Sequence, residues 1–148
     1  MNTEKPKTSA NPGILFSDEE FLQYIELREA EKHPMRTKEQ MAYYIVWLLR
    51  HEKAGSAYAV LLDKRNRFLG SVKIKDHHCW LAQMFPLLED MRDKLGAESY
   101  FVGHNHVDKP MIPSYEDYDI TAAMKNWKGM TFKGHFITDG NLDYKEIE

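Results

Sequence analysis

The side chains best suited to chemistry are His104 and His106, which flank Asn105 directly after a short apolar run. In an extended segment, side chains two residues apart point to the same side. We therefore expect the two imidazoles to lie together at the end of a strand. Asp117 follows later, and the intervening loop can return its carboxylate to the rings. Two histidines and one carboxylate form a zinc site that leaves the fourth position for water, and zinc lowers the pKa of that water to about 7.

Each of these residues also has an ordinary structural interpretation. Ser114 stands three positions before Asp117, which is the pattern of a helix N-cap with an acidic residue at the positive end of the helix. A histidine near the end of a strand is often only a hydrogen-bonded residue of a partly buried core. The combination of these residue types at this spacing favours the metal site over the separate structural interpretations.

Helices and strands are expected to alternate around these residues. Two capping-box patterns, Ser17 with Glu20 and Thr37 with Gln40, predict two helices in the N-terminal part. Apolar runs and alternating patterns predict strands, and the last two flank Asp139-Gly140, a hairpin signal. The predicted strands are residues 58–62, 68–75, 99–103, 132–138 and 142–147.

Two further helices are predicted between the strands. Pro86 is expected in the first turn of one helix, which Gly96 ends. Ser114 is expected to begin the other. Residues 1–13 are polar and lack periodicity, which predicts a flexible arm. The expected order is α-α-β-β-α-β-α-β-β, with a single α/β (α+β) domain over residues 14–148.

Composition and charge limit the classes of function. The chain has 148 residues, 43% of them hydrophobic, which suits one globular domain. A formal net charge of -3 argues against binding nucleic acid through a broad basic surface. No apolar run is long enough to cross a bilayer, and no signal peptide is expected at the start. The single cysteine, Cys79, excludes an intramolecular disulfide, so we expect a cytoplasmic location.

The spacing H-x-H-x7-S-x-x-D resembles the motif of the JAMM (JAB/MPN) metallopeptidases. The stretch GHNHVDKPMIPSYEDYDIT is similar to the RadC-like branch, which has an H-N-H core, a proline before the serine and a threonine four residues after the aspartate. Pro113 and Thr121 match the last two positions. Upstream, VLLDKRNRFLG resembles the first hairpin of that family, and GHFITDG resembles its closing strand and turn. The similarity covers roughly residues 37–148.

This resemblance implies a mixed, curved β-sheet between helices, related to the cytidine-deaminase-like fold, with two added N-terminal helices. It implies zinc bound by His104, His106 and Asp117. It also implies that Ser114 stabilises the oxyanion of a tetrahedral intermediate. The expected reaction is hydrolysis of a peptide or isopeptide bond by metal-activated water, with a protein or peptide as substrate.

The chain departs from the family pattern at the general base. Active members carry a glutamate on or just before the first strand, but alignment through Asp63 places Gly55 or Ser56 there. The nearest carboxylate is Glu52, which is either a displaced base or a solvated residue after the second helix. Without a base, metal binding would persist while hydrolysis largely fails, leaving a catalytically silent protein-binding module. A DNA-repair-associated factor is a third hypothesis, which the net charge disfavours.

Other polar residues near the motif are interpreted as structural. The loop Val107-Asp108-Lys109-Pro110 differs from the turn usual in the family, so no substrate preference carries over. Asp76-His77-His78-Cys79 lacks a partner pair at zinc-finger spacing and is interpreted as the polar start of a helix. His135 matches a histidine of the family's closing strand and is expected to be structural rather than catalytic. Neither the oligomeric state nor the biological pathway is predicted.

Overall fold

The computed structural model describes residues 31–74, 80–141 and 143–148. The chain divides into two compact units, Met1–His33 and Pro34–Glu148, and all elements described here belong to the second. The arm predicted at residues 1–13, the helix expected after Ser17 and the cluster at 76–79 lie outside the described residues. The elements are α2 (Lys38–Leu49), β1 (Ala57–Leu62), β2 (Phe68–Ile74), α3 (Trp80–Leu95), β3 (Ser99–Asn105), α4 (Tyr115–Asn126), β4 (Thr131–Thr138) and β5 (Tyr144–Glu146).

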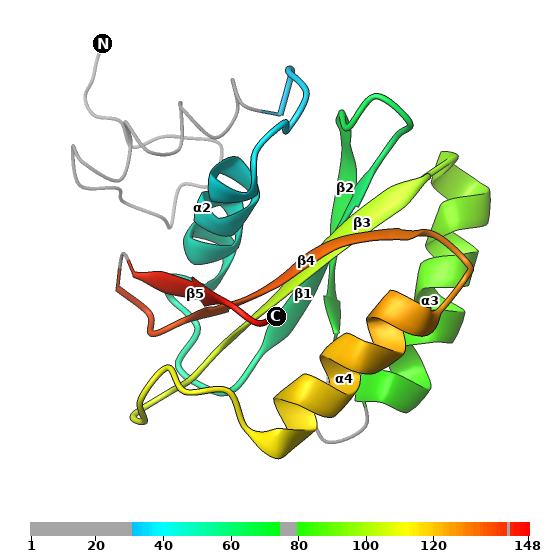
Figure 1. The fold of residues 1–148 in the computed structure, drawn as a ribbon. Helices are drawn as coiled ribbons and strands as arrows, with labels where there is room; N and C mark the ends of the chain where they lie inside the picture. Colours follow the sequence, from blue (N-terminus) through cyan, green and yellow to red (C-terminus); the bar gives the residue numbers. More distant parts are fainter. Residues whose placement is uncertain (1–30, 75–79, 142) are drawn as a thin grey trace, which may run out of the picture. The chain divides into compact units, whose positions relative to one another are not determined.

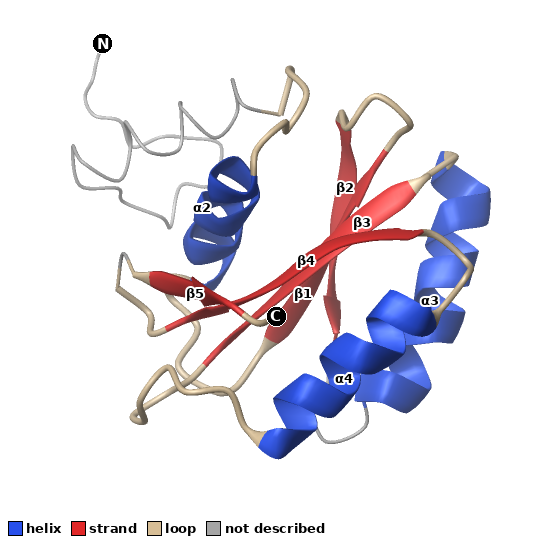
Figure 2. Cartoon of the chain, viewed as in Figure 1, coloured by secondary structure: helices blue, strands red, loops and turns tan. Residues whose placement is uncertain are grey.

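The five strands form one mixed sheet in the order β2-β1-β3-β4-β5. β3 pairs antiparallel with β1 and parallel with β4, and α4 forms the connection between the two parallel strands. Helix α2 packs on one face of the sheet, while α3 and α4 cover the other (Figures 1 and 2). The predicted order of elements is therefore confirmed from the second helix onward, as is the mixed sheet between helices.

Helix α2 begins as the sequence predicts. The Thr37 side chain accepts a hydrogen bond from the backbone N–H of Gln40, and the Gln40 side chain accepts one from the Thr37 N–H, which completes a capping box. Ile45 and Leu49 are fully buried. The helix thus contributes apolar side chains to the core on its own face of the sheet.

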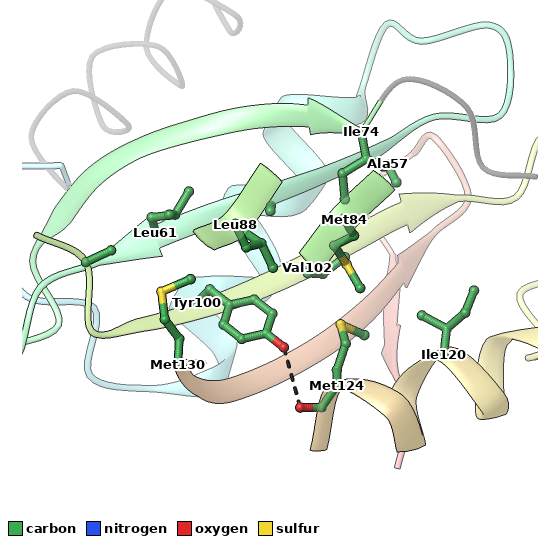
Figure 3. Close-up of a cluster of buried hydrophobic side chains, with 12 residues drawn as sticks. Ala57, Leu61, Ile74, Met84, Leu88, Tyr100, Val102, Ile120, Met124 and Met130 are labelled. Carbon is green, nitrogen blue, oxygen red and sulfur yellow. Dashed lines mark hydrogen bonds between the residues drawn. The ribbon is translucent and has the colours of Figure 1, made fainter. Parts of the chain in front are cut away.

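β3 lies at the centre of the sheet, and every one of its residues is buried. Helices cover both faces here, which explains why the run Tyr-Phe-Val is apolar without alternation. Tyr100 and Val102 point into a cluster with Met84 and Leu88 of α3 and Met124 of α4 (Figure 3). This cluster fills the space between the sheet and the helices on that face.

Helix α3 begins earlier than the sequence predicts. It starts at Trp80, so Pro86 lies inside the helix and not in its first turn. Proline removes one backbone hydrogen bond there, but the fully buried Met84 and Leu88 on either side anchor this part of the helix in the core. Gly96 ends the helix as expected, with a positive φ of 73° and its N–H bonded to the Arg92 carbonyl.

The two C-terminal strands pair around the turn that the sequence predicts at Asp139-Gly140. β4 and β5 pair antiparallel, and Gly140 in the connection has a φ of 89°, which favours glycine. No helix in the described part of the chain is long and apolar enough to span a bilayer.

Candidate metal centre

His104 and His106 lie where β3 ends, on the face of the sheet covered by α3 and α4. His104 pairs with Ala57 of β1, which belongs to the core cluster on that face, and paired residues point to the same side. Beyond the end of β3 the chain remains hydrogen-bonded to β4, because the His106 N–H donates to the Thr138 carbonyl at 2.9 Å. The extended backbone therefore places both imidazoles on one side, as the H-x-H spacing predicts.

Asp117 reaches the two histidines from the first turn of α4. Ser114 is the N-cap: its Oγ accepts a hydrogen bond from the Asp117 N–H at 3.0 Å, and Asp117 Oδ2 accepts one from the Ser114 N–H at 2.9 Å. The capping box fixes the carboxylate at the positive end of the helix, which stabilises its charge. The predicted cap and the predicted ligand are thus compatible roles of one local structure.

The three side chains converge on one point. His104 Nε2 lies 3.3 Å from Asp117 Oδ1, His106 Nε2 lies 3.3 Å from Asp117 Oδ2, and the two Nε2 atoms are 3.2 Å apart. Ligand atoms held about 2.0–2.1 Å from a tetrahedral ion are about 3.3 Å apart. Neighbouring ligands of an octahedral magnesium ion would be about 2.9 Å apart. The two Nε2 atoms are therefore spaced as ligands of a tetrahedral ion, and each has a different oxygen of the Asp117 carboxylate at a similar distance.

The hydrogen-bond partner of His106 Nδ1 determines which nitrogen of this ring carries the proton. Nδ1 lies 2.8 Å from the Pro110 carbonyl oxygen, which can only accept a hydrogen bond. The proton is therefore on Nδ1, and Nε2 directs its lone pair toward His104 and Asp117. Pro110 belongs to the loop over residues 107–110, so this loop supplies a contact that orients a predicted ligand.

Burial and charge shape the ionisation of the cluster. Burial lowers the pKa of His104, although the hydrogen bond that the protonated ring makes to Asp117 and the charge of Asp117 act in the opposite direction. Burial alone would raise the pKa of Asp117, but the hydrogen bond and charge of His104 and the N–H of Ser114 outweigh it and hold this pKa well below its usual value. A negative carboxylate beside a histidine that favours its neutral form is the donor set that a divalent cation requires.

The structure does not bring Glu52 to these residues. Its carboxylate accepts hydrogen bonds from Lys73 at 3.0 Å, Ser56 at 3.1 Å and Tyr58 at 3.3 Å. Tyr58 pairs with Gly103, and a Cβ at Gly103 would meet Ile45 of α2. The partners of Glu52 therefore lie on the α2 face, across the sheet from His104.

The charge state of Glu52 also fits a structural role. The hydrogen bond from Lys73 holds the pKa of the Glu52 carboxyl below its usual value, although burial acts against this. Ser56, which with Gly55 is one of the two residues that the resemblance suggests for the position of a glutamate, donates its hydroxyl to Glu52. Among the described residues, His104, His106 and Asp117 form the one group of three or more histidine, cysteine, aspartate or glutamate side chains whose ligand atoms all lie within 4.8 Å of one another.

His135 is a polar neighbour whose importance the sequence understates. Its Nε2 lies 2.9 Å from His104 Nδ1, and the residue is completely buried in β4. Burial lowers the pKa of His135 well below its usual value, so the ring is neutral. The signal in the sequence is a histidine directly before the apolar pair Phe-Ile, on a strand that pairs with β3.

A scan of the sequence against protein-family models gives no match, and a search of the curated proteins finds no similar sequence.

Proposed function

We propose that the protein is a zinc-dependent metallohydrolase that resembles the RadC-like JAMM proteins and cleaves a peptide or isopeptide bond. The observation that carries this proposal is the buried convergence of His104, His106 and Asp117, in which both Nε2 atoms lie within 3.3 Å of the carboxylate. The finer description of the fold belongs to the same proposal: an MPN/JAB-type, cytidine-deaminase-like sheet in which α2 is the second of two added helices.

Zinc suits the donor set better than magnesium or calcium. Imidazole nitrogen is a common zinc ligand, whereas the two alkaline-earth ions prefer oxygen. Three protein ligands would leave the fourth tetrahedral position of a zinc ion to water, and such an ion would polarise a carbonyl group and supply activated water near neutral pH.

Ser114 is the residue that we propose to assist at the coordination position left open by the three ligands. Its Oγ accepts the Asp117 N–H, and its hydroxyl proton can still donate to an oxygen that becomes negative during the reaction. The side chain is exposed, unlike the three ligands. The proposed role is therefore to donate a hydrogen bond while the same residue caps α4.

Exposed apolar residues flank Ser114 and support a protein or peptide substrate. Ile112 is 67% exposed and Tyr115 is 92% exposed. Large apolar side chains that protrude into solvent beside a candidate site offer contacts to a polypeptide.

Metal content is the first test. We would purify the protein without a histidine tag, supply zinc, and measure bound metal by mass spectrometry in wild type, Asp117→Asn and Asp119→Asn. Asparagine at 117 keeps an acceptor for the Ser114 N–H but loses the charge, so zinc should fall from near one equivalent to a small fraction. Asp119 is exposed on the same helix and is the matched control, which should retain zinc. A wild-type protein without zinc, or equal zinc in all three, would contradict the proposed site.

A catalytically silent zinc module is the second candidate, and the position of Glu52 favours it. Without a carboxylate to move protons, the site would hold metal and the protein would act by binding other proteins. The zinc-loaded protein should be tested on peptide and isopeptide substrates beside Asp117→Asn and Glu52→Gln. Turnover lost in Asp117→Asn and retained in Glu52→Gln supports a hydrolase whose base is not Glu52. Turnover lost in both makes Glu52 the base, and no turnover at full zinc content supports the silent module.

A further inference from the structure

A chain of three buried hydrogen bonds runs behind the proposed metal ligand His104. His104 Nδ1 lies 2.9 Å from His135 Nε2, His135 Nδ1 lies 2.8 Å from Thr121 Oγ1, and Thr121 Oγ1 donates to the Asp117 carbonyl at 2.8 Å. His135 is completely buried, and Thr121 is 2% exposed. The chain therefore begins at one ligand and ends at the backbone of another.

The chemistry of the groups gives these bonds a direction. The Thr121 hydroxyl has one proton, which it donates to the Asp117 carbonyl, so toward His135 it can only accept. His135 Nδ1 must then carry the proton of the neutral ring, which leaves Nε2 as an acceptor. His104 Nδ1 therefore donates to His135, and His104 Nε2 presents its lone pair to the site.

The opposite direction would close the site to a metal ion. If Thr121 donated to His135 Nδ1, His135 Nε2 would donate to His104 Nδ1. His104 Nε2 would then carry a proton directed at Asp117 Oδ1, 3.3 Å away. Both arrangements hold the same number of protons, so the direction of the Thr121 hydroxyl decides which nitrogen of His104 is available.

We propose that Thr121 and His135 are positioning residues that hold His104 in the tautomer able to bind the metal ion. This inference rests on the proposed metal site. It extends that site to β4, because His135 joins the ligand strand β3 to the ligand helix α4 through side chains alone. Hydrogen bonds of this kind to ligand histidines typically change metal affinity by about 10–100-fold.

Thr121→Val and Thr121→Ser form a matched pair for the test. Valine keeps the shape of threonine without the hydroxyl, whereas serine keeps the hydroxyl. Zinc affinity, measured by competition with a chromogenic chelator, should fall about 10–100-fold in Thr121→Val and return close to wild type in Thr121→Ser. Thermal unfolding of the metal-free variants checks that both fold. Equal affinity in the three proteins would overturn the inference.

The tautomers themselves give a readout that a packing defect would not produce. Long-range ¹⁵N–¹H correlation spectra should show a protonated Nδ1 in His104 and in His135 of the wild type. Thr121→Val should lose this pattern, and Thr121→Ser should keep it. A proton on Nε2 of His104 in the wild type would overturn the inference. If the wild type binds no zinc, the proposed function fails, and the spectra of the metal-free wild type alone decide the inference.

Discussion

Asn105, which separates the two histidines, points away from them. Its side chain forms hydrogen bonds with the segment that precedes β1. Its Oδ1 accepts the Ser56 N–H at 2.7 Å, and its Nδ2 lies within 3.2 Å of the Ala54 carbonyl and 3.4 Å of the Glu52 carbonyl. The alternation along the strand thus gives adjacent residues opposite tasks. The two histidines face the proposed metal ion, and the residue between them fixes the loop on the other face.

Substitution of Asn105 should show how strongly this contact holds the loop. Asn105→Ala leaves the buried Ser56 N–H without its acceptor, and we expect a loss of about 1–3 kcal/mol in the free energy of unfolding. Asn105→Asp keeps an acceptor for the Ser56 N–H but replaces the Nδ2 donor by a carboxylate oxygen beside the Ala54 and Glu52 carbonyls, so it should destabilise the protein as well. Urea denaturation of the metal-free proteins measures both changes. If alanine and aspartate were equally mild, the bond to Ser56 would contribute little.

At the scale of elements, helix α2 and strand β3 approach each other at Gly103. A Cβ built there would lie 2.1 Å from Ile45 Cγ2, which is far inside van der Waals contact. Glycine is required because the backbone of β3 forms part of the surface on which α2 packs. The neighbouring residue is His104, so this contact also sets the position of a proposed ligand.

A double-mutant cycle at this contact tests the packing. Gly103→Ala should destabilise the protein by about 1–3 kcal/mol through overpacking. Ile45→Ala alone should cost about 2–5 kcal/mol by leaving a cavity. Because the added methyl group enters that cavity, the double variant should be less destabilised than the sum of the two single changes. Strict additivity in urea denaturation would show that the two residues do not interact.

The elements also show how much of the site the sequence could predict. Two local rules are sufficient to bring the three proposed ligands together: the alternation of a strand places His104 and His106 on one side, and the N-cap at Ser114 places Asp117 in the first turn. The position of Glu52 depends on the pairing of β1 with both neighbours, which is a long-range property that no local pattern contains. The bond between His135 and His104 likewise requires the register of β4 on β3. Pro86 was placed wrongly because buried residues around it outweigh its local preference.

At the scale of the whole molecule, the buried cluster of His104, His135 and Asp117 joins the sheet to α4. Protonation of its histidines at low pH opposes the folded state. His104 and His135 are buried with lowered pKa values, whereas in the unfolded chain a histidine titrates near pH 6.5. Above that pH both states are neutral, and the histidines contribute no pH dependence. Below it the unfolded chain binds protons that the folded protein resists, so stability falls as the pH falls.

The metal-free protein should therefore lose stability between pH 7 and pH 5, which is a higher pH range than protonation of its carboxylates alone would give. Each histidine that stays neutral contributes up to about 1.4 kcal/mol per pH unit below its unfolded pKa. Asp117, whose pKa is lowered, stabilises the fold above its unfolded pKa near 3.9, and this contribution disappears only at lower pH. Urea midpoints of the wild type and His135→Gln, measured in EDTA from pH 7.5 to 5, test the prediction. The variant should show a shallower dependence, and identical slopes would mean that His135 does not resist protonation in the folded protein.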